Sequence, residues 1–195
     1  MRRSWSIEDR EQPAGPGSVD PSSRSWRIGT AATVEWITSG TVSDGTITTA
    51  VPPLFSAYAT VVDPDHGDPV DPRDHERAVV DHLTRYGTTQ WWLGYLDTGA
   101  HDVVFPDAER VPMYWDWPYV LVQAGPDEAL TWRNTLPDLI FPLDRSWLFS
   151  MLWDDGWTCV GGPSTLVAEL ATDPLISARL VQLGEDPTPP GPISG

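Results

Sequence analysis

Proline and glycine divide this chain into short segments. Its 195 residues include 20 Pro and 16 Gly, and proline or charge interrupts every apolar stretch before it reaches the roughly 20 residues of a membrane span. Short β-branched and aromatic runs bounded by Gly or Pro are typical of antiparallel strands. We therefore expect an α+β fold with a mostly antiparallel sheet, about three helices and no membrane contact.

The two ends of the chain differ in composition from its middle. Residues 1–28 and 184–195 are rich in Gly, Pro, Ser or charge and show no apolar periodicity. Such segments cannot bury enough apolar surface to offset the entropy lost on ordering. The sequence thus predicts a disordered N-terminal tail over 1–28, a single domain over 29–183 and a disordered C-terminal tail over 184–195.

The clearest helix is expected over 72–86, with Pro in its first turn, Val79 and Leu83 on one stripe, and Gly87 just past its end. Hairpins are predicted where Asp44-Gly45 separates the β-branched runs 33–42 and 46–51, and where Asp154-Asp155-Gly156 separates 147–153 from 157–160. Further strands are expected at 90–96, 102–105, 111–115 and 119–123, and short helices at 126–133 and 164–171. Segment 54–62 reads as a strand or as a short helix followed by a strand, and 175–183 stays unassigned.

The charge of the chain is one-sided. Asp and Glu number 28 against 12 basic residues, all of them Arg, which leaves a net charge of −16. This balance opposes binding to nucleic-acid phosphates and to anionic membranes. A lone cysteine and the lack of an apolar run near the start predict a reduced, cytoplasmic location without a signal peptide.

Tryptophan is the most unusual part of the composition, with 11 copies. Trp91 and Trp92 are adjacent on an expected strand, so they should point to opposite faces. An exposed indole beside a carboxylate is typical of a protein interface. We therefore predict a Trp/Asp surface, and its members are Trp115, Asp116, Trp117, Asp154, Asp155 and Trp157. The alternative is that most of the indoles belong to the core.

A catalytic reading rests on Asp97-Thr98-Gly99 followed by Ala100. This segment resembles the Asp-Thr-Gly-Ala active-site turn of the retropepsin-like aspartic proteases. In that family two such aspartates share a proton and activate water. Since one Asp-Thr-Gly is present here, the resemblance implies a homodimer with Asp97 contributed by each copy, and Cys159-Val160-Gly161 would supply the later apolar-apolar-Gly element. The other reading is a strand-ending turn in which Asp97 caps its own backbone.

Signals for metals and cofactors are weak, and we expect none to be bound. The acidic loop 63–71 has carboxylates at the density of a calcium loop, but its glycine is one position early for an EF-hand. His75 and His82 share a helical face, yet nearby metal ligands are lacking. Cys159 has no base close to it in the sequence, so a buried thiol is the default interpretation.

Residues 51–190 as a whole resemble a family of small, uncharacterised proteins from high-GC bacteria that has no assigned activity. The segments that carry this resemblance are 91–99, 102–107 and 145–163. Together these features favour a binding protein over an enzyme, namely an acidic, immunity-like module that masks a basic protein partner through the Trp/Asp surface. The alternatives are the homodimeric aspartic hydrolase and a small-molecule-binding domain with a Trp-lined concavity. The sequence leaves the oligomeric state open.

Overall fold

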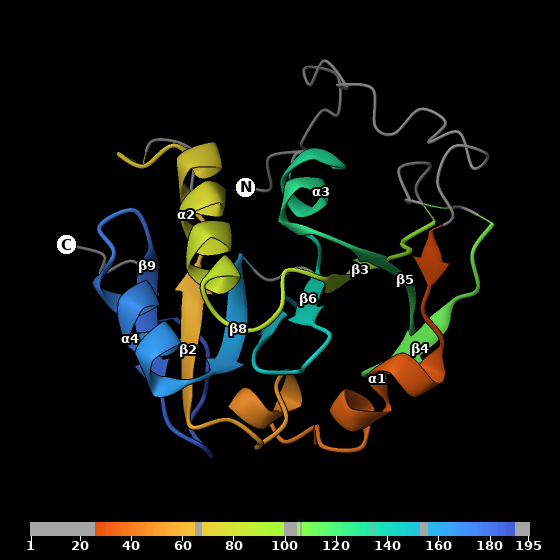
Figure 1. The fold of residues 1–195 in the computed structure, drawn as a ribbon. Helices are drawn as coiled ribbons and strands as arrows, with labels where there is room; N and C mark the ends of the chain where they lie inside the picture. Colours follow the sequence, from red (N-terminus) through yellow and green to blue (C-terminus); the bar gives the residue numbers. More distant parts are fainter. Residues whose placement is uncertain are drawn as a thin grey trace, which may run out of the picture.

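The computed structural model describes residues 26–64, 68–99, 105, 107–133, 135–152 and 156–189. Within them the chain forms one nine-stranded sheet, four α-helices and one 3₁₀ helix (Figure 1). This confirms the α+β class and the mostly antiparallel sheet. The strands are β1 (Arg27–Ile28), β2 (Ala57–Val62), β3 (Trp91–Leu96), β4 (Val111–Met113), β5 (Trp117–Ala124), β6 (Leu139–Pro142), β7 (Leu148–Ser150), β8 (Trp157–Gly162) and β9 (Ser177–Val181). The helices are α1 (Ala31–Thr38), η2 (Ile47–Thr49), α2 (Pro72–Thr84), α3 (Pro126–Thr131) and α4 (Ser164–Thr172).

All strand pairs of the sheet are antiparallel, in the order β1-β5-β3-β6-β7-β8-β2-β9, and β4 pairs with β5 beyond this path. The predicted pairing of the strands around the 154–156 turn is present, because Leu148 lies opposite Gly161 and Ser150 opposite Cys159. The turn residues Asp154 and Asp155 themselves lie outside the described residues.

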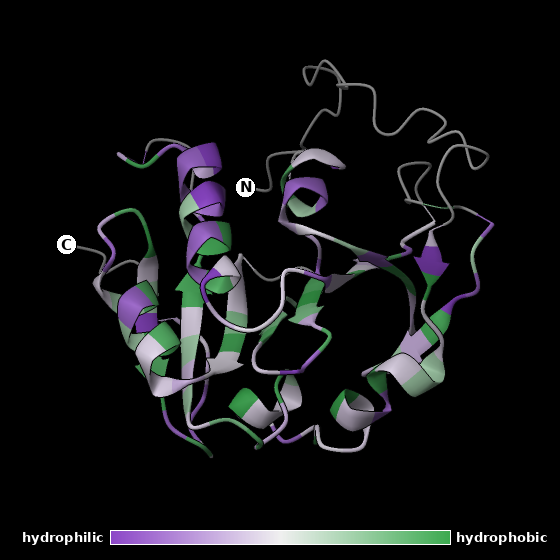
Figure 2. Ribbon diagram, in the orientation of Figure 1, coloured by the Kyte–Doolittle hydropathy of each residue, from purple (hydrophilic) through white to green (hydrophobic). Residues whose placement is uncertain are grey.

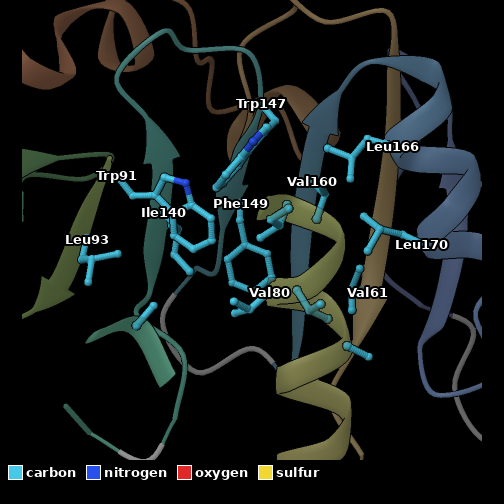
Figure 3. Close-up of a cluster of buried hydrophobic side chains, with 14 of the residues drawn as sticks. Val61, Val80, Trp91, Leu93, Ile140, Trp147, Phe149, Val160, Leu166 and Leu170 are labelled. Atoms are coloured by element: carbon cyan, nitrogen blue, oxygen red, sulfur yellow. The ribbon is translucent and has the colours of Figure 1, made fainter. Parts of the chain in front are cut away.

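Both faces of the sheet are covered, which decides where the tryptophans lie. Helices α2, α3 and α4 cover one face and form the helix-side core, which contains Trp91 and Trp147 (Figure 3). The opposite face carries α1 and η2 and forms the α1-side core, which contains Trp92. Trp91 and Trp92 therefore point to opposite faces as predicted, yet both are buried because each face has its own cover.

Helix α2 shows how local signals set the position of an element. The Asp71 carboxylate accepts a hydrogen bond of 2.8 Å from the Arg73 backbone N–H and so caps the helix in front of Pro72. Val79 and Leu83 are buried against the sheet, while hydrophilic residues cover the outer face of the helix (Figure 2). The helix ends at Thr84 rather than at residue 86, and Gly87 follows with a φ of 78°.

The predicted hairpin over 33–42 and 46–51 is wrong, because these segments form α1 and η2. The Thr33 hydroxyl accepts a 3.0 Å hydrogen bond from the Thr30 backbone N–H at the start of α1. Val34 and Ile37 stand three positions apart and are both buried in the α1-side core. Burial at helical spacing thus overrides the β-propensity of these residues.

The fold extends past both predicted tail boundaries. Arg27 and Ile28, expected in the N-terminal tail, pair with β5 as strand β1. In the segment expected to be the C-terminal tail, the Pro187 carbonyl accepts a 2.7 Å hydrogen bond from the Thr60 hydroxyl. Strand β9 occupies the unassigned segment near 175–183, and β6 forms where no strand was predicted. No helix in the described part of the chain is long and apolar enough to cross a membrane.

Candidate functional site

The loop that joins β4 to β5 has an unusual backbone conformation and presents an aromatic side chain to solvent. Met113 pairs with Trp117, so the loop consists of Tyr114, Trp115 and Asp116. Tyr114 and Asp116 have φ values of 53° and 62°, in the left-handed region that residues other than glycine rarely adopt. Such conformations persist only where the surroundings hold them in place.

Tyr114 supplies this hold. Its hydroxyl hydrogen-bonds to the Ser150 hydroxyl of β7 and donates to the Ala50 carbonyl at 3.2 Å. Ser150 is fully buried. Burial is the main cause that raises the pKa of Tyr114 above its ordinary value, so the phenol stays neutral. The loop is thereby fixed to the core of the sheet.

Trp115 projects from the loop with 47% of its surface exposed. Its indole N–H donates a 3.1 Å hydrogen bond to the Ser43 hydroxyl, and its ring centroid lies 4.8 Å from that of Trp117. Trp117 is half-buried and packs against the α1-side core. Trp115 therefore has a fixed orientation although it faces solvent.

A groove of about 180 Å³ lies beside this indole. Its other walls come from the end of α1 and from the segment that follows, and they bear the hydroxyls of Thr38, Thr41, Ser43 and Thr49 and the exposed side chain of Val42. Asp116 lies at its rim on the loop. Small-molecule sites usually measure about 300–1,000 Å³, so this groove has the size for a single inserted side chain.

The structure divides the predicted Trp/Asp surface. Trp115, Asp116 and Trp117 lie together, whereas Trp157 is half-buried on β8 and packs against the α1-side core. Strands β3, β6 and β7 separate β8 from β5 in the sheet. Asp154 and Asp155 lie outside the described residues. The remaining site, which we name the Trp115 site, consists of the 114–116 loop, Trp117 and the groove.

Asp97 forms a turn at the end of β3. Its carboxylate accepts hydrogen bonds of 2.9 Å from the Gly99 backbone N–H and 2.8 Å from the Arg110 guanidinium. The Gly99 contact and then the Arg110 contact lower the pKa of Asp97, so the group is ionised at neutral pH. Gly99 adopts a φ of 80°, and Thr98 connects the two residues of the turn. This geometry is that of a turn in which the Asp97 carboxylate caps the backbone of its own segment.

The two helix histidines contact neighbouring elements of the fold. His82 lies between the carboxylates of Glu169 on α4 and of Asp173 just after it, and His75 Nδ1 lies 3.0 Å from the Leu175 carbonyl. No group of three His, Cys, Asp or Glu within the described ranges is arranged to hold a metal ion. Cys159 is buried on β8, as predicted.

Sequence reasoning missed the far wall of the Trp115 site. Ser43 and Thr49 belong to the segment that was predicted to form a hairpin, and no motif connects them to Trp115. Their approach depends on α1 lying beside β4 (Figure 1).

Comparison with protein-family models, with curated proteins and with solved structures finds no match to this chain.

Proposed function

We propose that this chain is an acidic, non-enzymatic interaction module that binds a basic protein partner at the Trp115 site. The observation that carries this proposal is an exposed Trp115 held in a strained, anchored loop next to Asp116. Tryptophan is enriched among the few residues that dominate binding energy at interfaces. A masking role of the immunity type is consistent with such a module.

The chemistry of the site suits a cationic side chain. An ammonium or guanidinium group is attracted to the face of an indole and to a carboxylate. Trp115 and Asp116 supply these two groups beside a groove of about 180 Å³. The hydroxyls on the opposite wall offer further hydrogen-bond acceptors. We infer that an Arg or Lys side chain of the partner enters the groove.

The overall charge favours the same partner. A net charge of −16 steers a basic protein toward the chain and raises its association rate at low salt. Rim charges mostly affect association, while a buried aromatic contact mostly affects dissociation. The two contributions can therefore be separated by kinetics.

A peptide selection on the full chain tests the proposal. Random peptides displayed on phage are selected for binding, and the dissociation constants of the selected peptides are measured by calorimetry. We expect enrichment in Arg and Lys, and a loss of affinity of about tenfold or more with Trp115→Ala. Asp116→Asn should weaken binding and reduce its salt dependence.

Asp81→Asn is the matched control, because Asp81 is an exposed acid on α2, away from the loop. It removes the same charge and should leave the affinity nearly unchanged. The proposal fails if the selected peptides lack basic residues, or if Trp115→Ala binds them as tightly as the original chain.

A further inference from the structure

A second cavity, of about 500 Å³, shares no lining residue with the Trp115 site. It lies where α1, the segment before β2, the β6–β7 turn and the start of α4 meet. Its volume falls within the range of about 300–1,000 Å³ that is typical of small-molecule sites. The residues that decide its chemistry are Trp36, Leu54, Phe55, Ser56 and Arg145.

One side of the cavity is apolar and aromatic. Trp36 and Phe55 meet edge to face, with ring centroids 6.3 Å apart, and Leu54 is 65% exposed. Phe55 occupies its position because Gly161 of β8 has no side chain, since a Cβ atom there would lie 2.5 Å from the Phe55 ring. The sequence thus keeps a glycine in a central strand where it lets an aromatic ring line the cavity.

The lining of the cavity also includes a cation, Arg145. The guanidinium carbon of Arg145 lies 5.6 Å from the centroid of the Trp36 ring, within cation–π range. Among the described residues Arg145 forms no ion pair with a carboxylate, although acids outnumber arginines in this chain. The nearest acid in sequence, Asp144, instead accepts hydrogen bonds from the backbone N–H and the hydroxyl of Ser146.

The backbone of the β6–β7 turn directs this arginine. Arg145 has a φ of 57°, and its N–H donates a 3.0 Å hydrogen bond to the Pro142 carbonyl. Glycine or asparagine adopts this conformation at lower cost than arginine. This turn places the Arg145 side chain in the lining of the cavity, over the ring of Trp36.

Ser56 closes the end of the cavity near α4. Its hydroxyl accepts a 3.0 Å hydrogen bond from the Ser164 backbone N–H and donates to the Gly162 carbonyl. This bridge fixes the start of α4 against the segment before β2. These hydrogen bonds hold together the two segments that line this end of the cavity.

We propose that this cavity binds a small amphiphilic carboxylate, with its apolar or aromatic body against Trp36, Leu54 and Phe55 and its carboxylate on Arg145. A planar guanidinium pairs with a carboxylate through two parallel hydrogen bonds. Burial of a hydrocarbon or aromatic body against the apolar residues of the cavity favours binding. The inference is independent of the proposed protein partner, because the two sites share no lining residue.

A pair of probes with the same body tests it. Binding of 4-phenylbutyrate and of 4-phenylbutan-1-ol to the full chain is followed by calorimetry and by amide chemical shifts. We expect saturable 1:1 binding of the carboxylate and at least tenfold weaker binding of the alcohol. Arg145→Gln should weaken the binding of 4-phenylbutyrate at least tenfold and remove the preference for the carboxylate over the alcohol.

Arg145→Gly guards against a folding defect, because it removes the cation and relaxes the turn at once. This variant should fold at least as well as the original chain, and it should also fail to bind 4-phenylbutyrate. Arg73→Gln, at an exposed site on α2, and Trp115→Ala should leave the binding unchanged. Lack of saturation at millimolar concentration, equal binding of both probes, or unchanged binding by both Arg145 variants would each overturn the proposal.

Discussion

His82 Nε2 lies 2.8 Å from Asp173 Oδ2, and this contact joins the last turn of α2 to the residue that follows α4. The Nδ1 atom of the same ring lies 3.3 Å from the Glu169 carboxylate, which also accepts a hydrogen bond from the Tyr86 hydroxyl. The Leu175 backbone N–H and then His82 lower the pKa of Asp173. The two helices are thus connected through a histidine that sits between carboxylates.

This connection predicts a loss of stability in acid. Because folding lowers the pKa of Asp173 below its ordinary value of 3.8, the ionised group stabilises the fold above about pH 4. That contribution is lost as the pH falls through the lower, folded-state pKa. Asp173→Asn should therefore lower the urea midpoint at pH 7, and its difference from the original chain should shrink toward pH 3. The exposed Asp81→Asn should show little difference at either pH, and a constant Asp173 effect would contradict the assignment.

Glu76 on α2 predicts the opposite pH dependence. Burial raises its pKa to about 7, although the Leu136 backbone N–H opposes this shift. The folded state then binds a proton that the unfolded chain releases near pH 4.5, so stability falls as the pH rises from 4.5 to 7. At pH 8, Glu76→Gln should raise the free energy of unfolding, measured with urea, by about 1–2 kcal/mol. Near pH 4 the variant and the original chain should have the same free energy of unfolding. Equal stability at pH 8 would show that the carboxylate is better solvated than its position indicates.

The contacts of Trp147 allow us to predict how much stability is lost when a core indole is removed. Its ring meets that of Trp91 edge to face at 5.1 Å, and its N–H donates a 2.7 Å hydrogen bond to the Tyr86 carbonyl (Figure 3). Trp147→Ala should lower the free energy of unfolding by about 3–5 kcal/mol. The exposed Trp115→Ala should change it by less than about 1 kcal/mol. Urea denaturation followed by circular dichroism measures both, and similar losses in the two variants would contradict the division between core and surface indoles.

Gly161 predicts a steric limit inside β8. A Cβ atom at this position would approach Phe55 to 2.5 Å and Val51 to 2.6 Å. Gly161→Ala should therefore destabilise the fold by about 1–3 kcal/mol. It should also reshape the cavity that Phe55 lines. Gly156→Ala is the matched control, because a Cβ atom there meets no described atom within 4 Å. Thermal unfolding of both variants gives the comparison.

The parts of the fold that the sequence predicted are those with several agreeing local signals. Helix α2 combines the Asp71 cap, Pro72 and a clear apolar stripe, and it forms almost where expected. The segment around Val34 carries strand-forming residues, and its helical state depends on burial against a sheet that forms from distant strands. Strand β6 is a short run of four residues that is buried throughout and follows Pro137-Asp138, and its pairing with β3 establishes it as a strand.

In the candidate site, too, the features set by adjacent residues were predicted, and those set by tertiary contacts were not. The grouping of Trp115, Asp116 and Trp117 comes from adjacent sequence and is present in the structure. Trp157 is distant along the sheet, and the opposite wall at Ser43 depends on tertiary contacts. Most of the described indoles are packed inside or against the cores, because a sheet covered on both faces buries alternate residues in both directions.

The anchoring of Tyr114 to Ser150 has a thermodynamic consequence for any molecule that contacts the neighbouring indole. The loop conformation is fixed when the protein folds. A binding partner therefore contacts a Trp115 ring whose rotational freedom has already been removed. Little further entropy is lost on complex formation, and a larger part of the contact energy is available to slow dissociation.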